Sequence, residues 1–225
     1  MDTPLISIIM PTLNSGKFLS ESLKSVTGQT YKNYEVIIVD GGSVDETKSI
    51  ANQFEKITFF DQTDKGLAAA WNAGIKMANG NYIAFLDSDD WWDCNCLSNH
   101  VETLQKSPQA ICSIGHLQFF LDDPNSPPPG FKTSLLNKSH LGYMPGCFVG
   151  KKEVFDRIGL FETIWDIVSD IVWFAKLKNN IKEIRIVDNV VLHKRVHGKN
   201  LSYTTAQTPI YQKELLKILH GAMKK

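Results

Sequence analysis

Short apolar runs alternate with amphipathic segments along the first 90 residues of the chain. The apolar runs predict buried strands at residues 5–10, 35–39, 57–60 and 82–86. Between them, apolar side chains recur at helical spacing and predict helices at residues 16–27, 45–54 and 67–77. Strands that are apolar throughout and are separated by helices are typical of a parallel sheet covered on both faces. The pattern therefore predicts an α/β fold with a mostly parallel central sheet.

The second half of the chain has a less regular pattern. An apolar run covers residues 110–121, a β-branched strand is expected at 185–192, and helices are expected at 95–106, 154–158, 166–177 and 212–223. Four prolines exclude helix and central strand from residues 122–130, which we expect to form an exposed loop. Neither an internal repeat nor a clear domain boundary is visible, so we expect one domain.

The composition is that of an ordinary globular protein without net charge. Of the 225 residues, 43% are hydrophobic and 21% are charged, with 24 Lys plus Arg against 24 Asp plus Glu. A general nucleic-acid binder needs a basic surplus to neutralise phosphates, so we expect no nucleic-acid partner. No apolar run approaches the roughly 20 residues of a membrane helix, and the N-terminus has no basic signal-like region. The sequence therefore favours a cytoplasmic protein.

The four cysteines contain a single C-x-C and no second pair at zinc-like spacing, so a structural zinc site is not expected. Four cysteines in a chain of this length do not resemble the disulfide framework of a small secreted domain either. We expect buried free thiols, because a free cysteine packs like a small hydrophobic residue. The residues are Cys94, Cys96, Cys112 and Cys147.

Polar, acidic or glycine-rich segments follow three of the predicted strands, at residues 11–14, 40–45 and 87–90. In open parallel sheets, ligands bind beyond the carboxyl ends of the strands. We therefore expect these three segments to lie on one rim of the sheet and to form a ligand site there.

Asp87-Ser88-Asp89, at the end of a predicted strand, is the most informative of these segments. Two carboxylates so close repel each other, and a hard divalent cation removes that cost. Mg²⁺ or Mn²⁺ bound by one or two carboxylates usually completes its coordination with water and substrate phosphates. A turn or helix N-cap is the alternative, because Asp and Ser suit both. The position on the expected rim favours the metal.

Other nucleotide-binding and hydrolytic motifs are missing from the sequence. There is no G-x-G-x-x-G after the first strand and no G-x-x-x-x-G-K-[ST], so a dinucleotide site or a P-loop is poorly supported. H-E-x-x-H and G-x-S-x-G are also missing. We therefore expect phosphate to be held through a metal rather than a glycine cradle.

Four motifs follow one another along the chain: Pro11-Thr12-Leu13-Asn14, Val39-Asp40-Gly41-Gly42-Ser43-Val44-Asp45, Asp64-Lys65-Gly66 with Asn72-Ala73-Gly74, and Phe85-Leu86-Asp87-Ser88-Asp89-Asp90. In this order and at this spacing they resemble glycosyltransferase family 2, whose members are inverting enzymes with the GT-A fold. The resemblance is close over residues 5–93 and looser to about residue 205. It implies a single GT-A domain over 1–225, with a nucleotide-sugar half at about 1–93, an acceptor half at about 94–205 and a C-terminal helix at about 206–225.

The resemblance also implies roles for residues of the rim. Asp40 would accept hydrogen bonds from the base, a charge-assisted contact. Asp87 and Asp89 would form the family's D-x-D element, with Asp89 as the direct metal ligand. Gly41 stands where many members have a second Asp, which leaves Asp40 intact. The other residues implied to line the nucleotide-sugar pocket are Pro11, Thr12, Asn14, Gly42, Lys65, Gly66 and Ser88.

A catalytic base is expected from the second half of the chain, because the acceptor attacks from the opposite face of the sugar. The resemblance implies Asp170, in Ser169-Asp170-Ile171-Val172-Trp173-Phe174. Val172 stands where the family often has a second acidic residue. Asp166, four residues earlier and on the same face of the predicted helix, is the competing candidate. The apolar neighbours of Asp170 indicate burial, and a buried carboxylate without a function is uncommon.

Further candidates lie beside the acidic segment or near the C-terminus. Arg195-Val196-His197-Gly198, followed by Ser202, resembles an element that closes over the diphosphate. His197 is expected to bind the metal or a phosphate, with a structural histidine as the alternative. Trp91 and Trp92 either stack on a sugar or base or pack in the core. Gly146 is expected on the acceptor side, where it would permit close approach of substrate.

The expected cofactor is Mn²⁺ or Mg²⁺, and the expected partners are a nucleotide-diphosphate sugar, a uridine nucleotide by resemblance, and a saccharide or lipid-linked acceptor. A role in bacterial polysaccharide or glycoconjugate synthesis is implied in the same way. An oligomer is left open. The basic C-terminal helix indicates either peripheral contact with the inner face of a membrane or a solvated helix face. Its basic residues are Lys213, Lys217, Lys224 and Lys225.

Two other functions stay open. A nucleotidyltransferase shares the sheet and the metal, but Ser15-Gly16-Lys17 is only a thin version of the loop that would hold a triphosphate. A non-catalytic module that binds sugar or nucleotide is the second alternative. The carboxylates Asp87, Asp89 and Asp170 argue against it.

Overall fold

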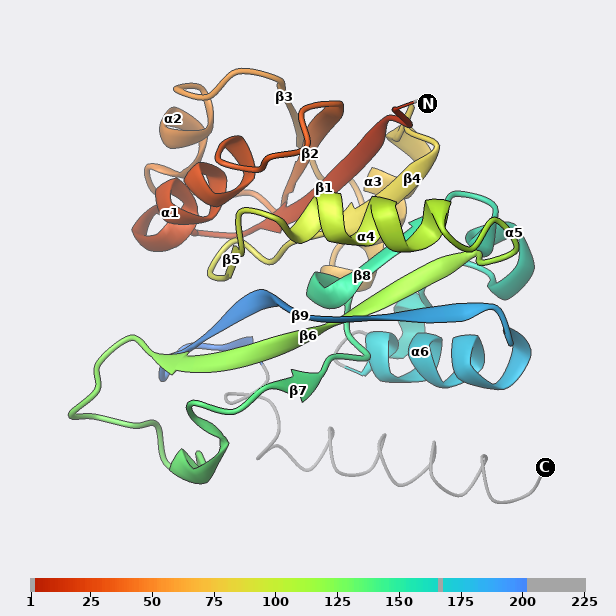
Figure 1. Ribbon diagram of the computed structural model, residues 1–225. Helices are drawn as coiled ribbons and strands as arrows, with labels where there is room; N and C mark the ends of the chain where they lie inside the picture. The colour runs from red at the N-terminus through yellow and green to blue at the C-terminus, as the bar shows by residue number, and fades with distance from the viewer. Residues whose placement is uncertain (1–2, 166–167, 202–225) are drawn as a thin grey trace.

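The computed structural model describes residues 3–165 and 168–201, which form one mixed sheet with helices on both faces (Figure 1). The strands are β1 (Ile6–Thr12), β2 (Tyr34–Asp40), β3 (Ile57–Asp61), β4 (Tyr82–Phe85), β5 (Trp91–Trp92), β6 (Cys112–Leu121), β7 (His140–Leu141), β8 (Phe148–Lys151) and β9 (Ile184–Val196). The α-helices are α1 (Gly16–Thr27), α2 (Thr47–Ala51), α3 (Leu67–Met77), α4 (Cys96–Gln105), α5 (Val154–Ile158) and α6 (Ser169–Asn180). Short 3₁₀ turns are η1 (Thr133–Leu135), η2 (Pro145–Cys147) and η3 (Thr163–Trp165). In the described part of the chain, the strand order is β3-β2-β1-β4-β8-β6-β9-β5, and β7 pairs with β6.

The first half of the sheet is parallel, as the apolar runs predict. β1 pairs in parallel with β2 and β4, and β2 pairs in parallel with β3. α1 and α3 have the predicted bounds. α2 is shorter than the predicted helix at 45–54. It begins at Thr47 because Asp45 accepts hydrogen bonds from the backbone N–H groups of Thr47 (3.0 Å) and Gly16 (2.9 Å), which hold Asp45 in the preceding loop.

The second half makes the sheet mixed rather than mostly parallel. β8 runs antiparallel to both β4 and β6, while β6 and β9 are parallel. The chain returns from β6 to β8 through a reversing segment that contains β7 and η2, so no helical crossover sets a parallel direction there. This reversal places β8 beside β4 and continues the sheet through β6 and β9.

β1 continues through Pro11, where the sequence pattern predicted its end. A proline lacks the N–H that a central strand donates to a neighbour. On the β4 side, Ile9 C=O accepts from Leu86 N–H (3.1 Å), and β4 itself ends at Phe85. On the other side, Thr12 C=O accepts from Gly41 N–H (2.8 Å). Pro11 therefore lies beyond the reach of β4, and the strand extends to the rim without losing a ladder bond.

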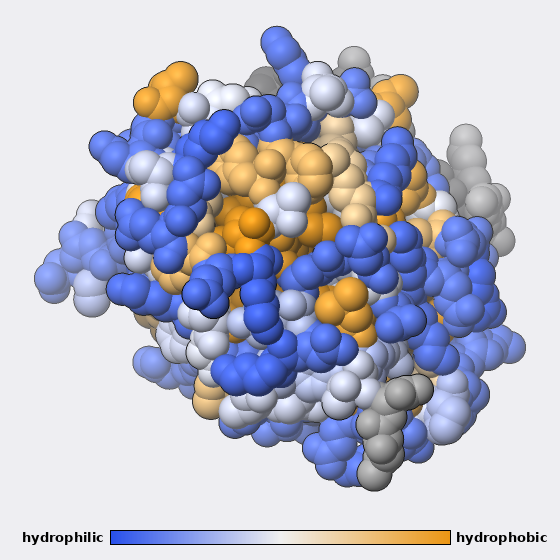
Figure 2. Space-filling view, turned by 90° about the horizontal axis from the view of Figure 1, so that it is seen from above, coloured by the Kyte–Doolittle hydropathy of each residue, from blue (hydrophilic) through white to orange (hydrophobic). Residues whose placement is uncertain are grey.

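The two faces of the sheet bury separate hydrophobic clusters. Successive residues of β1 alternate between them, with Ile8 in the cluster that α1 and α4 cover and Ile9 in the cluster that α3 and α6 cover. In the second cluster, Trp173 stacks on Phe155 with ring centroids 5.3 Å apart. Figure 2 shows the face seen from above in Figure 1, where apolar side chains fill a central hollow and polar side chains surround it. Packing on both faces fixes the strand ends that carry the site.

β9 continues past residue 192, where its apolar pattern ends, to Val196. The extension brings Lys194 and Arg195 to the rim. α6 begins at Ser169, whereas residues 166–167 and the predicted helix at 212–223 lie outside the described residues. Residues 122–130 contain no helix or strand, as their prolines predict.

All four cysteines are free. Cys96, Cys112 and Cys147 are buried as expected, whereas Cys94 is exposed because it lies in the turn between β5 and α4. Among the helices of the described segments, none is long and apolar enough to cross a membrane.

Candidate functional site

The loops after β1, β2 and β4 meet on one rim of the sheet, as predicted. The backbone N–H of Asn14 donates to Ser43 Oγ (2.7 Å), and Asn14 Oδ1 accepts from Val44 N–H (3.0 Å), so the first two loops are joined. The hydroxyls of Ser15 and Ser88 are hydrogen-bonded (2.7 Å) and join the first loop to the third. Asn14 has φ of 49°, a left-handed conformation that Asn tolerates better than most residues. The rim is therefore a connected structure rather than three separate turns.

Asp40 lies at the end of β2 with 3% of its surface exposed. Its Oδ1 accepts from the hydroxyls of Thr12 (2.7 Å) and Ser43 (2.6 Å), and its Oδ2 accepts from the backbone N–H groups of Gly42 (3.1 Å) and Ser43 (2.7 Å). Burial alone would raise the pKa of Asp40, but these hydrogen bonds outweigh it and lower the pKa. Asp40 thus holds the β1 and β2 loops in place. A nucleobase N–H group could bond to Asp40 only by sharing an oxygen with one of these four donors or by replacing that donor.

The loop after β3 reaches the same region. Gln62 N–H donates to the Asp40 carbonyl (2.7 Å), and the Gln62 side chain donates to the Gly66 carbonyl (2.7 Å). Gly42 and Gly66 have φ of 94° and 100°, where a side chain would be strained, so both loops need glycine at these positions. The Lys65 side chain next to Gly66 is exposed and Pro11 is buried.

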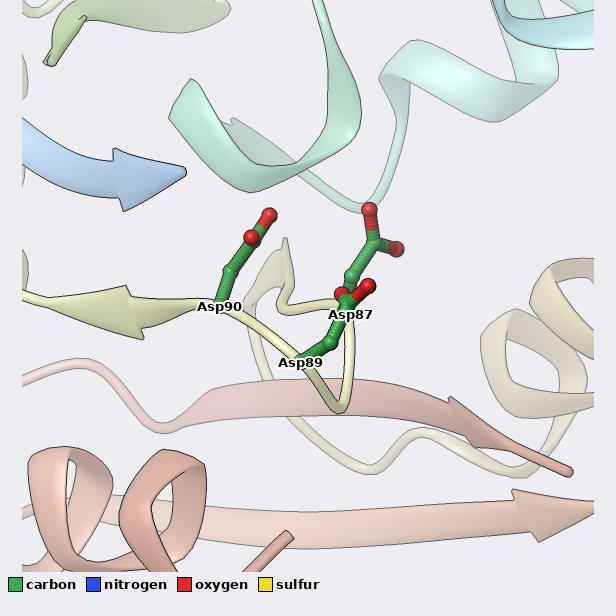
Figure 3. Close-up of side chains that lie close together, drawn as sticks. All are labelled: Asp87, Asp89 and Asp90. Atoms are coloured by element: carbon green, nitrogen blue, oxygen red, sulfur yellow. The ribbon is translucent and has the colours of Figure 1, made fainter. Parts of the chain in front are cut away.

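The acidic cluster of Asp87, Asp89 and Asp90 follows β4 (Figure 3). One ligand oxygen from each carboxylate lies within 4.8 Å of the others. The side chains of Asp87 and Asp89 are 27% and 26% exposed, whereas that of Asp90 is 1% exposed. The hydroxyl of Ser22 in α1 donates to the carbonyls of Ser88 (2.8 Å) and Asp90 (2.5 Å), which fixes the loop. Two of the three carboxylates therefore open to the rim.

Asp90 is hydrogen-bonded to β9 through both of its oxygens. Its Oδ1 accepts from the backbone N–H of Arg195 (2.8 Å), and its Oδ2 accepts from Lys194 Nζ (2.8 Å). Lys194 Nζ also lies 3.5 Å from Asp87 Oδ2. Burial would lower the pKa of Lys194, but the negative charges of the three aspartates outweigh it and raise the pKa, so the ammonium form is held. Burial raises the pKa of Asp87, and the nearby Asp89 charge adds to the effect.

Arg195 connects β9 to the backbone of the acidic cluster. Its guanidinium is 7% exposed and lies between two aromatic rings, 4.6 Å from the Phe18 centroid and 4.7 Å from the Phe120 centroid. Its Nε donates to the Asp89 carbonyl (2.9 Å). The guanidinium also forms ion pairs with Asp122 (3.1 Å) and Glu21. The position of the Asp89 main chain is thereby set from the opposite half of the sheet.

The Asp89 carboxylate is oriented by two residues that follow β9. Its Oδ2 lies 3.1 Å from His197 Nε2 and accepts from Asn200 Nδ2 at 3.0 Å. His197 Nδ1 accepts from the backbone N–H of Lys199 (3.2 Å), so in this tautomer Nε2 carries the proton and donates to Asp89. Burial would raise the pKa of Asp89, but the His197 hydrogen bond and the Lys194 charge lower it. In this geometry His197 is a hydrogen-bond partner of the Asp89 carboxylate. Ser202 lies outside the described residues.

Asp170 lies in the first turn of α6 and is half-buried. It accepts a hydrogen bond from Ile171 N–H (2.8 Å). Burial raises the pKa of Asp170, and the negative charge of Asp87 raises it further. The structure therefore brings Asp170 within electrostatic range of the acidic cluster. Asp166 lies outside the described residues.

The residues predicted on the acceptor side are packed against the protein itself. Trp91 stacks on His193 with ring centroids 3.6 Å apart and an interplanar angle of 10°. Trp92 is buried, and its Nε1 donates to the Gly146 carbonyl (2.8 Å). A Cβ at Gly146 would lie 2.8 Å from Leu192 Cδ2. Packing alone therefore explains Gly146 and Trp92, and one face of Trp91 is already covered.

Asp87 and Asp89 form a donor set that fits a divalent cation. Hard cations such as Mg²⁺ and Mn²⁺ prefer carboxylate oxygens and keep open positions for water or phosphate. The partial exposure of both side chains leaves such positions, whereas Asp90 has both oxygens bonded. The sequence pattern missed Lys194 and Asn200, because nothing in a linear motif indicates that β9 pairs with β5, the strand that follows the acidic cluster.

Comparison with known proteins agrees with this arrangement. Residues 7–159 match the family model for glycosyl transferase family 2. The uncharacterized glycosyltransferase RT0329 of Rickettsia typhi is 30% identical over 216 residues, which cover 90% of this chain and 67% of the relative. The putative teichuronic acid biosynthesis glycosyltransferase TuaG of Bacillus subtilis is 35% identical over 118 residues, covering 50% of this chain and 47% of the relative. The chain spans only 22% of the length of another curated relative, the glycosyltransferase GlyA of Streptococcus pneumoniae.

Two solved structures share the fold. TarS 1–349 of S. aureus, in complex with UDP-GlcNAc, superimposes with a TM-score of 0.71 at 18% identity, covering 95% of this chain and 65% of that one. The mannosyltransferase PcManGT of Pyrobaculum calidifontis, in complex with GDP-Man and Mn²⁺, gives a TM-score of 0.68 at 19% identity, covering 100% and 66%. At these identities the likeness shows the fold, which is the expected GT-A fold.

Proposed function

The chain belongs to glycosyl transferase family 2, and we propose that it is an inverting glycosyltransferase that moves a sugar from a nucleotide-diphosphate donor to an acceptor hydroxyl. The observation that carries the proposal is the single rim on which Asp87 and Asp89 meet the β1 and β2 loops, with Asp170 in electrostatic range. A uridine donor is favoured by TarS with UDP-GlcNAc, although PcManGT holds GDP-Man.

Asp87 and Asp89 would hold Mn²⁺ or Mg²⁺ through their exposed oxygens. Such an ion would neutralise the charge that grows on the diphosphate as it leaves. His197 and Asn200 orient Asp89 for this role by hydrogen bonds of 3.1 and 3.0 Å. PcManGT with bound Mn²⁺ supports the metal, because it shares the fold.

The nucleotide would lie along the β1, β2 and β3 loops. Thr12, Asn14 and Gly42 belong to the hydrogen-bonded rim around Asp40, and Lys65 and Gly66 border it from the β3 side. Asp40 would accept from the base by sharing an oxygen with one of its internal donors. Because these loops are preorganised, the site loses little chain entropy when the donor binds.

Asp170 would take the proton of the acceptor hydroxyl. Its pKa, raised by burial and by Asp87, makes the carboxylate a better base than an exposed Asp. Its place in the first turn of α6 gives it a rigid support. The acceptor would be a saccharide or a lipid-linked saccharide, and TuaG supports a role in polysaccharide synthesis.

A donor screen tests the function. Purified protein is incubated with UDP-, GDP- and dTDP-sugars in Mn²⁺ or in EDTA, and released nucleoside diphosphate is measured. We expect Mn²⁺-dependent release from one donor class that Asp170→Asn reduces. Release of pyrophosphate from a nucleoside triphosphate would instead identify a nucleotidyltransferase. Tight donor binding without release from any donor, with saccharide acceptors present, would identify a binding module.

A further inference from the structure

Lys194 is a positive charge enclosed by the acidic cluster. Its side chain is 18% exposed, and its Nζ lies 2.8 Å from Asp90 Oδ2 and 3.5 Å from Asp87 Oδ2. Lysine is almost never buried without a partner, because its ammonium loses hydration. Burial at this position therefore depends on the two aspartates, and their burial depends on Lys194.

The cation divides the acidic cluster into two parts. Asp90 uses one oxygen for Lys194 and the other for the backbone of Arg195, and its side chain is only 1% exposed, so it is the least accessible of the three carboxylates to a metal. Asp87 and Asp89 remain partly exposed on the rim. Lys194 is less exposed than Asp87 and Asp89 and forms its shorter ion pair with the buried Asp90.

The carboxylates around Lys194 need a positive charge near them even before a metal binds. Removing Lys194 would leave several carboxylates facing one another with only neutral donors between them. Such groups repel strongly when water is excluded. The carboxylates in electrostatic contact with Lys194 are Asp87, Asp89, Asp90 and Asp170.

From this geometry we infer that Lys194 is a positioning residue, a built-in cation that assembles the acidic cluster before the metal arrives and limits how tightly the metal binds. The inference rests on the proposed metal-dependent donor site. Lys194 neutralises Asp90 and part of Asp87, so the metal-free loop keeps its shape. It also repels a second cation, so the metal binds tightly only when donor phosphates add negative charge.

The test measures Mn²⁺ alone, without nucleotide. Free Mn²⁺ is titrated by electron paramagnetic resonance in wild type, Lys194→Met and Lys194→Gln, and melting temperatures are recorded in EDTA and in Mn²⁺. Gln keeps a hydrogen-bond donor without the charge, so it serves if the Met variant does not fold. The control is Lys106→Met, which removes a lysine that pairs with Glu102 at 2.6 Å but is 72% exposed.

We expect the Lys194 variants to bind Mn²⁺ at least about tenfold more tightly. Tenfold corresponds to the repulsion energy between a +1 and a +2 charge about 6 Å apart, calculated with the dielectric constant of water. Their melting temperatures should fall in EDTA and recover in Mn²⁺, while Lys106→Met stays unchanged. A residue that merely supports the loop would lower Mn²⁺ affinity when removed.

Equal, measurable Mn²⁺ affinity in wild type and Lys194→Gln overturns the inference and leaves the metal-dependent transferase standing. Weaker binding in Lys194→Gln overturns it as well. If Lys194→Gln binds Mn²⁺ and wild type binds none even with UDP, Lys194 is supported as the resident cation and the metal proposal fails. Absence of Mn²⁺ binding in both proteins, with and without UDP, overturns both.

Discussion

Asp40→Asn should destabilise the fold as well as the nucleotide pocket. Asn keeps the size of Asp but replaces one acceptor oxygen by an N–H₂ group. In wild type each Asp40 oxygen accepts from two donors. Oδ1 accepts from the hydroxyls of Thr12 and Ser43, and Oδ2 accepts from the backbone N–H groups of Gly42 and Ser43. In one orientation the new N–H₂ group would face two backbone N–H donors; in the other it would face two hydroxyls, which would have to turn and accept, and in both the charge of the acceptor is lost.

The magnitude follows from the bonds that are lost. A hydrogen bond to a charged group contributes about 1.5–3 kcal/mol, so losing the equivalent of two of them costs about 3–6 kcal/mol of unfolding free energy. Total stability is typically about 5–15 kcal/mol. For a chain of this length, each kcal/mol shifts the melting temperature by about 2–4 °C, so we expect a loss on the order of 10 °C.

The assay is urea unfolding, compared with Asp61→Asn as the control. Asp61 pairs with Asp40 across β2 and β3, but its side chain is 79% exposed and it forms only a 3.9 Å ion pair with Lys48. The control should stay within about 0.5 kcal/mol of wild type. An Asp40→Asn protein as stable as the control would refute the assignment of Asp40 as the organiser of the rim.

The pH dependence gives a second check on the same bonds. The pKa of Asp40 is lower in the folded protein than in the unfolded chain, where it is about 3.9. Its contribution to stability is therefore complete above about pH 4 and disappears as the pH falls through the folded-state value. The difference in stability between wild type and Asp40→Asn should be constant near neutral pH and shrink below about pH 4.

Three further perturbations separate metal binding, catalysis and packing. Asp89→Ala should weaken UDP binding in Mn²⁺ to the level seen in EDTA, measured by calorimetry; full affinity in both conditions would exclude a metal at Asp89. Asp170→Asn should lower sugar transfer by about 10²–10⁴ with donor affinity and melting temperature nearly unchanged, whereas Asp166→Asn should be mild; the reverse result would move the base to Asp166. Gly146→Ala should cost about 1–3 kcal/mol in urea unfolding, because its Cβ would lie 2.8 Å from Leu192 Cδ2; an unchanged midpoint would show that Leu192 yields without cost.

The hydrophobic pattern alone determined the first half of the fold. Apolar runs at residues 35–39 and 57–60 became β2 and β3 with small changes at their ends, and the helices at 16–27 and 67–77 have their predicted bounds. These elements are local, because a helical period of 3.6 residues or a continuous apolar run can be recognised within about a dozen residues. The common rim followed, because parallel strands place their carboxyl ends on one edge.

The same pattern could not show how polar groups are satisfied. The sequence predicts that Asp40 faces the nucleotide, and the structure adds that it accepts four hydrogen bonds from Thr12, Gly42 and Ser43. The sequence predicts Gly146 and Trp91 on the acceptor side, and the structure adds that Leu192 and His193 lie against them. Thr12, Leu192 and His193 are distant in sequence from the residues that they contact, and no local period encodes these contacts.

Only the tertiary structure decided the charge arrangement of the site. Lys194 and Asp90 are 104 residues apart in the chain and 2.8 Å apart in space. β9 loses its apolar pattern after residue 192 but continues to Val196, because pairing with β6 and burial of its charges against the acidic cluster replace the missing hydrophobicity. Motif order predicts which carboxylates gather at a strand end. Long-range contacts, which form only when β9 joins the sheet, decide which carboxylates are neutralised and which stay open to a ligand.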